Sequence, residues 1–111
     1  MSIKVILSKV GPLPLTATFD APADSPMYLE VVGSVYSSNA NRLLGIAVQL
    51  DNKPIGTPAQ IWSNGINTHR AVVPAYIPVQ LQFGKHTLTL TAANGDTVSD
   101  LNDTFTVVLH Y

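Results

Sequence analysis

The sequence contains no cysteine, and only 12% of its 111 residues are charged. The absence of cysteine excludes disulfides, thiolate metal ligands and a cysteine nucleophile, and it fits a reducing compartment or a bacterial source. Charged residues usually make up about 25% of a soluble domain, so uncharged polar side chains must cover much of this surface. Low charge weakens the repulsion between copies of a chain, and we therefore expect a homo-oligomer.

Long apolar runs and clustered basic residues are also missing. The six Lys and Arg are scattered and the formal net charge is −1, which excludes the basic stripe of a nucleic-acid-binding protein. No run approaches the roughly 20 apolar residues that span a bilayer. The apolar stretch at 3–7 is shorter than the core of a signal peptide. We expect a soluble, unprocessed chain that is either cytoplasmic or exported by a signal-independent route.

Known catalytic motifs are absent as well. The chain has no nucleophile elbow, no Walker or dinucleotide-binding glycine pattern and no zinc-protease helix motif. A nucleophile, a base and an orienting group cannot be assembled from the motifs present. We therefore predict that the protein is not an enzyme and needs no cofactor.

The most informative pattern that is present lies in the last third of the chain. Residues 79–83, 86–91 and 105–111 each alternate apolar with polar side chains. Turn-forming residues at 84–85 and 94–96 separate these runs. A period of two between turn signals is typical of antiparallel strands with one solvated face.

Similar segments precede this region. Strands are predicted at 3–8, 15–19, 27–37, 44–50, 55–62 and 67–73, and no helical periodicity persists. Pro58 assigns the segment 55–62 to a sheet edge or an irregular path, because proline cannot donate to a central ladder. Pro74 and Pro78 are expected to interrupt the chain after residue 73.

About eight short strands without room for crossover helices predict an all-β fold. Residues 1–111 are expected to form a single antiparallel β-sandwich domain, since this length can bury one core. The sequence leaves jelly-roll and immunoglobulin-like topologies open.

Two segments resemble parts of bacterial immunoglobulin-like modules. Residues 84–92 resemble their Gly-x-His-Thr-Leu strand, and residues 50–57 resemble their hairpin ending in Ile-Gly-Thr. The strands at 27–36 and 102–109 are also similar to jelly rolls of the tumour-necrosis-factor-like type, which assemble as trimers. These resemblances imply a sandwich fold and transfer no binding residue, because no functional motif matches.

One predicted loop concentrates an aromatic ring, amides and a guanidinium. Such groups suit a shallow site for a glycan or a similar polar ligand, because the ring supplies stacking area and the planar groups supply direction. The alternative is a core tryptophan beside an Asn-Gly hairpin turn. The candidate ligand-binding residues are Trp62, Asn64, Asn67, His69 and Arg70.

The acidic residues and histidines raise the question of a metal. Oxygen ligands at close spacing suit calcium, although turn chemistry explains the same residues and is the favoured interpretation. By strand phase His86 should face the core and His110 the solvent, which disfavours a shared histidine site. His69 stands alone near the Asn-Gly turn. The candidate calcium ligands are Asp96, Asp100, Asn102 and Asp103.

The sequence therefore favours a non-enzymatic, self-associating binding module, lectin-like in its ligand class. The alternative is a structural subunit of an appendage, a phage-like particle or a secreted assembly. In that case Tyr28 and Tyr36, which share the polar face of one long strand, would contribute to subunit contact.

Overall fold

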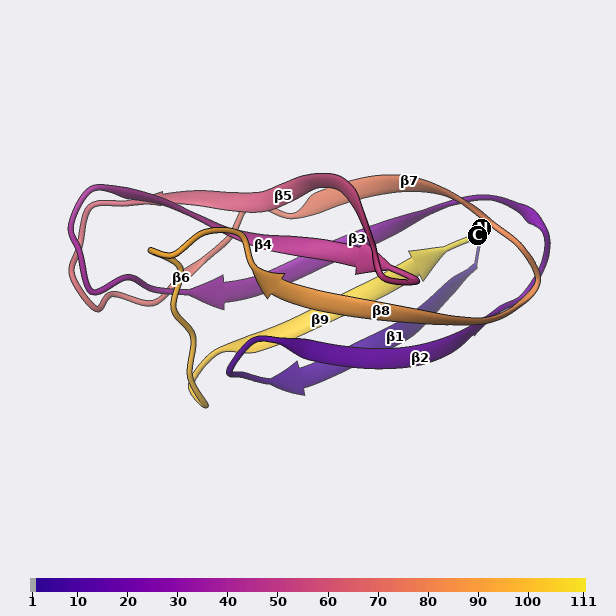
Figure 1. The fold of residues 1–111 in the computed structure, drawn as a ribbon, viewed down its shortest axis with the longest axis horizontal. Helices are drawn as coiled ribbons and strands as arrows, with labels where there is room; N and C mark the ends of the chain where they lie inside the picture. Colours follow the sequence, from indigo (N-terminus) through magenta and orange to yellow (C-terminus); the bar gives the residue numbers. More distant parts are fainter. Residues whose placement is uncertain (1) are drawn as a thin grey trace.

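Alternating side chains build two antiparallel sheets that pack face to face in the computed structural model, which describes residues 2–111 (Figure 1). The sandwich is elongated, with extents of 44 × 24 × 21 Å. Its strands are β1 (Ile3–Val10), β2 (Leu15–Ala21), β3 (Ser25–Val35), β4 (Arg42–Leu50), β5 (Lys53–Ser63), β6 (Arg70–Ala71), β7 (Ala75–Leu81), β8 (Gly84–Ala92) and β9 (Thr104–His110).

The strand order is that of a jelly roll. One sheet has the order β1-β9-β3-β6, with β7 also pairing with β3, and the other has the order β2-β8-β4-β5. The chain crosses from one sheet to the other at most connections, and among the described residues it stays in the same sheet only at the β4–β5 hairpin and between β6 and β7. The predicted all-β antiparallel sandwich is confirmed, and of the two topologies left open the structure has the jelly roll.

The core lies between the sheets and is built largely from alternate residues of the longer strands. In β3, Leu29, Val31 and Val35 are fully buried, and in β9 so are Val107 and Leu109. Burying side chains of this size contributes about 1.5–3 kcal/mol each, which fixes the phase of every strand. The outward-facing residues are therefore determined by the inward-facing ones.

The segment around Pro74 and Pro78 differs from the prediction. Only Arg70–Ala71 of the predicted strand 67–73 is a strand, and Pro78 lies inside β7 instead of interrupting it. β7 pairs with β3 alone, so the missing proline N–H faces the open edge and removes no ladder hydrogen bond. Pro58 likewise lies in β5, an edge strand, as its sequence position predicts.

The two pairs of sheet edges are protected differently. On one side the Nζ atoms of Lys4 and Lys9 in β1 donate to the carbonyl oxygens of Asp20 and Thr16, at 3.0 and 2.8 Å. These lysines cap the free carbonyls of β2 and discourage pairing with another chain. On the other side a single backbone hydrogen bond, from a residue just before β7 to β5, joins the sheets. That second side stays open along most of β7.

His110 lies on the outer face, as predicted, yet it is mostly covered. Its ring stacks on that of Tyr28 with centroids 4.4 Å apart, and its Nε2 is 2.8 Å from Glu30 Oε1. Only 15% of the side chain is exposed. Strand phase predicts the face correctly, but it cannot reveal that neighbouring outer-face side chains cover the imidazole. Among residues 2–111, no helix is long and apolar enough to cross a membrane.

His86 connects the β4–β5 turn to β8 at the end of the sandwich that carries the termini. Its Nδ1 is 2.6 Å from Asp51 Oδ2 and its Nε2 is 2.7 Å from the carbonyl oxygen of Gln82. The pKa of His86 is raised, and the hydrogen bond to Asp51 is the largest cause, with the one to Gln82 second. The pKa of Asp51 is lowered, and the hydrogen bond to His86 is again the largest cause, with the one from the Thr87 amide second. The pair is therefore charged over a wider pH range when folded.

These shifts predict a stability maximum in mildly acidic solution. The raised pKa of His86 stabilises the fold below about pH 6.5, and this contribution is lost as the pH rises through the folded-state pKa. The lowered pKa of Asp51 stabilises the fold above about pH 4, and this contribution is lost as the pH falls through its folded-state pKa. We expect Asp51→Asn to lower the unfolding free energy at pH 5 by about 1 kcal/mol or less, and by a smaller amount at pH 8.5.

Urea denaturation at the two pH values measures this difference. Asn tolerates the left-handed conformation at position 51, where φ is 51°, so the variant removes charge without adding backbone strain. Asp20→Asn is the matched control. An equal loss of stability at pH 5 and pH 8.5 would contradict the prediction.

Candidate functional site

Four connections gather at the end of the sandwich opposite the chain termini, and we call this region the loop end (Figure 1). They comprise residues 11–14, 36–41, 64–69 and 93–103. Every residue of the two predicted sites lies in one of these connections or in a strand beside it. The jelly-roll topology thus brings together segments far apart in the sequence.

Trp62 is exposed on the outer face of the four-stranded sheet. It pairs with Leu43 of β4, which is out of phase with the fully buried Leu44. Because successive side chains of a strand point to opposite faces, Trp62 points away from the core. Its exposed fraction is 53%, so the alternative of a core tryptophan is wrong.

Uncharged polar groups surround this tryptophan. Its Nε1–H donates to Asn64 Oδ1 at 2.6 Å, which restrains the indole ring. Gln60 lies two residues before Trp62 on the same face of β5, and Asn94 Nδ2 donates to the Leu43 carbonyl at 2.9 Å. We call these five residues the Trp62 patch: an aromatic and an aliphatic side chain bordered by three amides.

A second group forms around the fully buried carboxylate of Asp103. Its Oδ1 accepts from the Ser34 hydroxyl at 2.8 Å and lies 2.7 Å from His69 Nδ1, and its Oδ2 accepts from the Asp100 amide at 2.9 Å. Charge-assisted hydrogen bonds of this kind offset the cost of burying a carboxylate. Asp103 therefore ties the β8–β9 connection to β3.

The Asp103 group lies on the outer face of the other sheet. The His69 ring packs against Tyr36, with centroids 4.4 Å apart, and its Nε2 is 3.7 Å from Asp100 Oδ2. The hydrogen bond to Asp103 is the main cause that raises the pKa of His69. Both ring nitrogens face carboxylates, which favours the protonated form of the imidazole and ties the β5–β6 connection to the β8–β9 connection.

The five predicted ligand-binding residues do not form one cluster. Trp62 and Asn64 are together in the Trp62 patch, whereas His69 lies on the opposite outer face. Asn67 occupies a left-handed turn position with φ of 54° and donates its amide N–H to the β3–β4 connection. Arg70 is exposed on β6. The β5–β6 connection crosses from one sheet to the other, and this separates residues that are neighbours in sequence.

The four candidate calcium ligands are also divided. Asp100 and Asp103 belong to the Asp103 group, and Asn102 donates its amide N–H to Asp100 Oδ1 at 2.8 Å. Asp96 lies apart, with its Oδ1 3.4 Å from Arg42 Nε. Turn chemistry accounts for the amide hydrogen bonds within 94–103.

His69, Asp100 and Asp103 do offer atoms that lie within 4.8 Å of one another, which is compatible with a metal ion. The donor set includes an imidazole, which suits transition metals better than calcium. However, the 2.7 Å separation of His69 Nδ1 and Asp103 Oδ1 is that of a hydrogen bond. The existing contacts are therefore explained without an ion.

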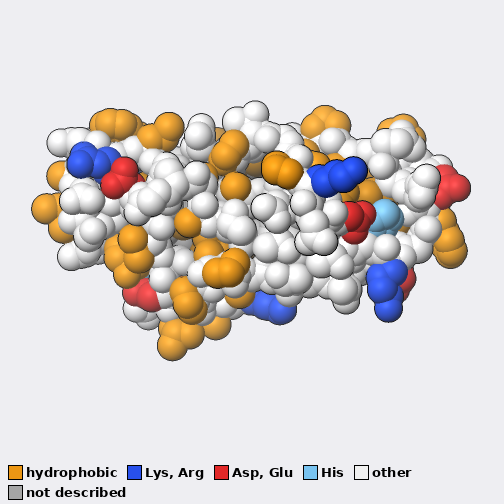
Figure 2. Space-filling model, in the orientation of Figure 1, with side chains coloured by type: hydrophobic (Ala, Val, Ile, Leu, Met, Phe, Trp, Pro, Cys, Tyr) orange, Lys and Arg blue, Asp and Glu red, His pale blue; other side chains and the backbone are white. Residues whose placement is uncertain are grey.

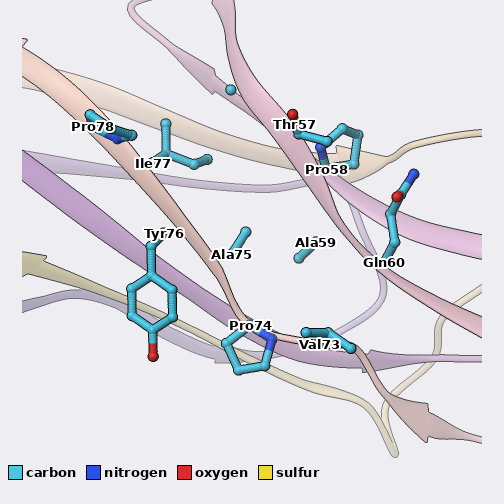
Figure 3. A pocket seen from close by; sticks show the side chains of 11 residues that line it. Thr57, Pro58, Ala59, Gln60, Val73, Pro74, Ala75, Tyr76, Ile77 and Pro78 are labelled. Atoms are coloured by element: carbon cyan, nitrogen blue, oxygen red, sulfur yellow. The ribbon is translucent and has the colours of Figure 1, made fainter.

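An open groove between β5 and β7 is a feature that sequence reasoning missed. It encloses about 560 Å³ and is lined by residues 56–60 and 73–78. Figure 3 shows the short side chains of Ala59 and Ala75 between the two strands, with larger groups on both sides. A signal was present in the sequence, since Gln60 shares the strand phase of Trp62 and prolines mark both edges.

Comparisons with known proteins place the chain among structures of the same fold. No protein-family model and no curated protein sequence matches it. The C-terminal domain of EclA, a sugar-binding protein, is similar over 98% of this chain and 79% of that chain, with a TM-score of 0.51 and 12% identity. A family 35 carbohydrate-binding module from Clostridium thermocellum is similar over 96% and 90%, with a TM-score of 0.47 and 12% identity. At this identity the likeness to the EclA domain shows the fold alone.

The Asp103 group predicts unequal costs for two aspartate substitutions in the same connection. Asp103→Ala would leave the Ser34 hydroxyl and the Asp100 amide without their acceptor, at about 1–3 kcal/mol for each unsatisfied group. Asp96→Ala removes an exposed ion pair with Arg42 and a long, exposed hydrogen bond from Asn39 Nδ2, and an exposed pair of this kind contributes about 0–1 kcal/mol. Chemical denaturation of both variants measures the difference, and similar stabilities would contradict the assigned role of Asp103.

Proposed function

We propose that this protein is a non-enzymatic carbohydrate-binding module that binds glycans through the Trp62 patch. The observation that carries the proposal is the exposed Trp62 ring, which is restrained by its hydrogen bond to Asn64. A large apolar ring that is costly to expose and is also held in place is typical of a binding surface.

The chemistry of the patch suits a sugar. The indole face can cover the apolar side of a pyranose ring, and amides at its border can donate to and accept from hydroxyl groups. Figure 2 shows that charged groups are sparse on the face it displays, with uncharged surface between them. The sugar-binding EclA domain, which has a similar fold, adds support for this ligand class.

The arrangement of the Asp103 group supports a binding role over an enzymatic one. Asp103 lies between Ser34 and His69 and bonds to both. A serine nucleophile needs the imidazole beside its hydroxyl, with the carboxylate behind the imidazole. The order found here stabilises a loop and places the carboxylate, not the imidazole, beside the hydroxyl.

Removing the indole ring should abolish most glycan binding. We expect Trp62→Ala to weaken binding at least about tenfold, because a central aromatic anchor contributes about 2 kcal/mol or more. A glycan array identifies bound sugars, and isothermal titration calorimetry then measures affinity for the wild type and the variant. Phe83→Ala, which removes an exposed aromatic ring at the opposite end, is the matched control. Unchanged affinity in Trp62→Ala would refute the proposal.

Self-association as a structural subunit is the second candidate, and the outer face of the five-stranded sheet favours it. Ile3 and Val5 of β1 are 63% and 56% exposed there, and the stacked Tyr28 and His110 lie on the same face. Apolar side chains spread over a solvated sheet face are typical of a subunit contact.

Light scattering on a size-exclusion column tests this contact. We expect a mass above that of one chain, and we expect Val5→Glu to reduce it to one chain, because a charge would be buried in the interface. Leu101→Glu, at an exposed loop position, is the control. Repeating the measurement with calcium tests whether calcium changes the assembly. A single-chain mass for the wild type in both conditions would exclude self-association.

A further inference from the structure

Small residues and two bulges shape the groove between β5 and β7. Residues 56–58 of β5 lie opposite a single residue of β4, and Gly56 there has φ of +64°. A Cβ at this glycine would lie 2.8 Å from the Ile77 side chain, so only glycine allows the close approach. The second bulge lies between β6 and β7, where three residues face two of β3.

The groove does not suit an added protein strand as its occupant. Strand addition requires N–H groups along an open edge, and Pro58, Pro74 and Pro78 provide none. Bulges in both edges also disturb the regular spacing that a ladder needs. At the end of the groove nearest Trp62, the backbone N–H of Val73 donates to the Gln60 carbonyl at 2.9 Å and closes the gap.

The lining chemistry fits a neutral ligand with hydroxyl groups. None of the eleven lining residues carries a charge. Thr57, Gln60 and Tyr76 bring a hydroxyl, an amide and a phenol to the rims, and Tyr76 is 60% exposed. The volume of about 560 Å³ lies within the range of ligand pockets, about 300–1,000 Å³. An anionic ligand would find no counter-charge here.

Gln60 connects this groove to the Trp62 patch. Its side chain lines the groove, and it lies on the same strand face as Trp62, about 7 Å away along β5. Beyond the groove, Tyr76 and Pro78 also line a second depression of about 440 Å³ together with Tyr28. The lining residues of both hollows are uncharged, and aromatic rings lie at both ends of a surface that runs from one sheet across the open edge to the other. Glu30, the cross-strand partner of Tyr76, borders its far end.

We propose that the β5–β7 groove is a further glycan subsite that continues the Trp62 patch, so that the protein binds a neutral oligosaccharide chain and not a single sugar. This inference rests on the proposed function. Trp62 anchors one part of the chain, Gln60 lies between the two parts, and Tyr76 contacts the part that crosses the groove.

Amide chemical shifts of the ¹⁵N-labelled chain test both parts at once. The probes are cellotetraose, xylotetraose, mannotetraose and β-1,3-linked galactotetraose, each paired with its disaccharide. We expect at least one tetrasaccharide to shift the Trp62 indole N–H together with the amides of Gln60 and Tyr76. Its disaccharide should bind at least about tenfold more weakly, because it reaches fewer contacts.

Two variants separate the groove from the patch. Ala75→Leu fills the groove, and Tyr76→Ala removes its exposed ring without adding volume. Either should reduce the affinity for the tetrasaccharide toward that for the disaccharide, while the Trp62 indole signal still shifts. Phe83→Ala is the control, and the dispersion of the amide spectrum reports whether each variant folds.

The outcomes distinguish the two proposals. Shifts confined to the Trp62 patch, with both groove variants binding like the wild type, would overturn the groove subsite and leave the proposed function intact. Shifts confined to the groove would overturn the continuous site and the role of Trp62. No shift with any of the eight probes would overturn both. Equal affinity for tetragalacturonate would overturn the assignment to neutral chains.

Discussion

Burial of alternate side chains between the two sheets determines which residues this sandwich presents to solvent. Once Leu44 and Val35 are committed to the core, Trp62 and Tyr36 must face outward on opposite sides of the sandwich. A shift of one residue in β5 would turn the Trp62 indole toward the core, and a shift of one residue in β3 would turn Val35 toward solvent. The packing of the core therefore fixes which side chains form the candidate binding surface.

The open edges of the sheets explain much of the remaining surface. Two lysines cap the carbonyls of β2, so that side of the sandwich offers little to another strand. The opposite side uses prolines and bulges, which prevent strand pairing without filling the space between β5 and β7. Prolines protect a sheet edge by removing backbone N–H donors, which leaves the space between the edges open. Lysine side chains protect an edge by covering its carbonyl groups, which closes that space. This difference places the groove at one edge only.

Most of the strands could be predicted because alternation is a local property. The segment from Phe105 to Leu109 and the long segment that contains Leu29 alternate without interruption, and both form strands. Pro78 misled the prediction because its effect depends on whether its strand has one neighbour or two. The covering of His110 by Tyr28 could not be predicted either, since it arises from cross-strand pairing.

The candidate site shows the same division between local and tertiary information. The sandwich class, an edge or irregular path at Pro58 and the presence of an aromatic ring among amides could be predicted from the sequence, because these follow from period, proline chemistry and composition. The exposure of Trp62, the grouping of His69 with Asp100 and Asp103 on the other face, and the groove beside Gln60 depend on the folded arrangement of the chain. Burial, convergence and cavities arise from the pairing of strands that are distant in sequence, and a local pattern does not encode that pairing.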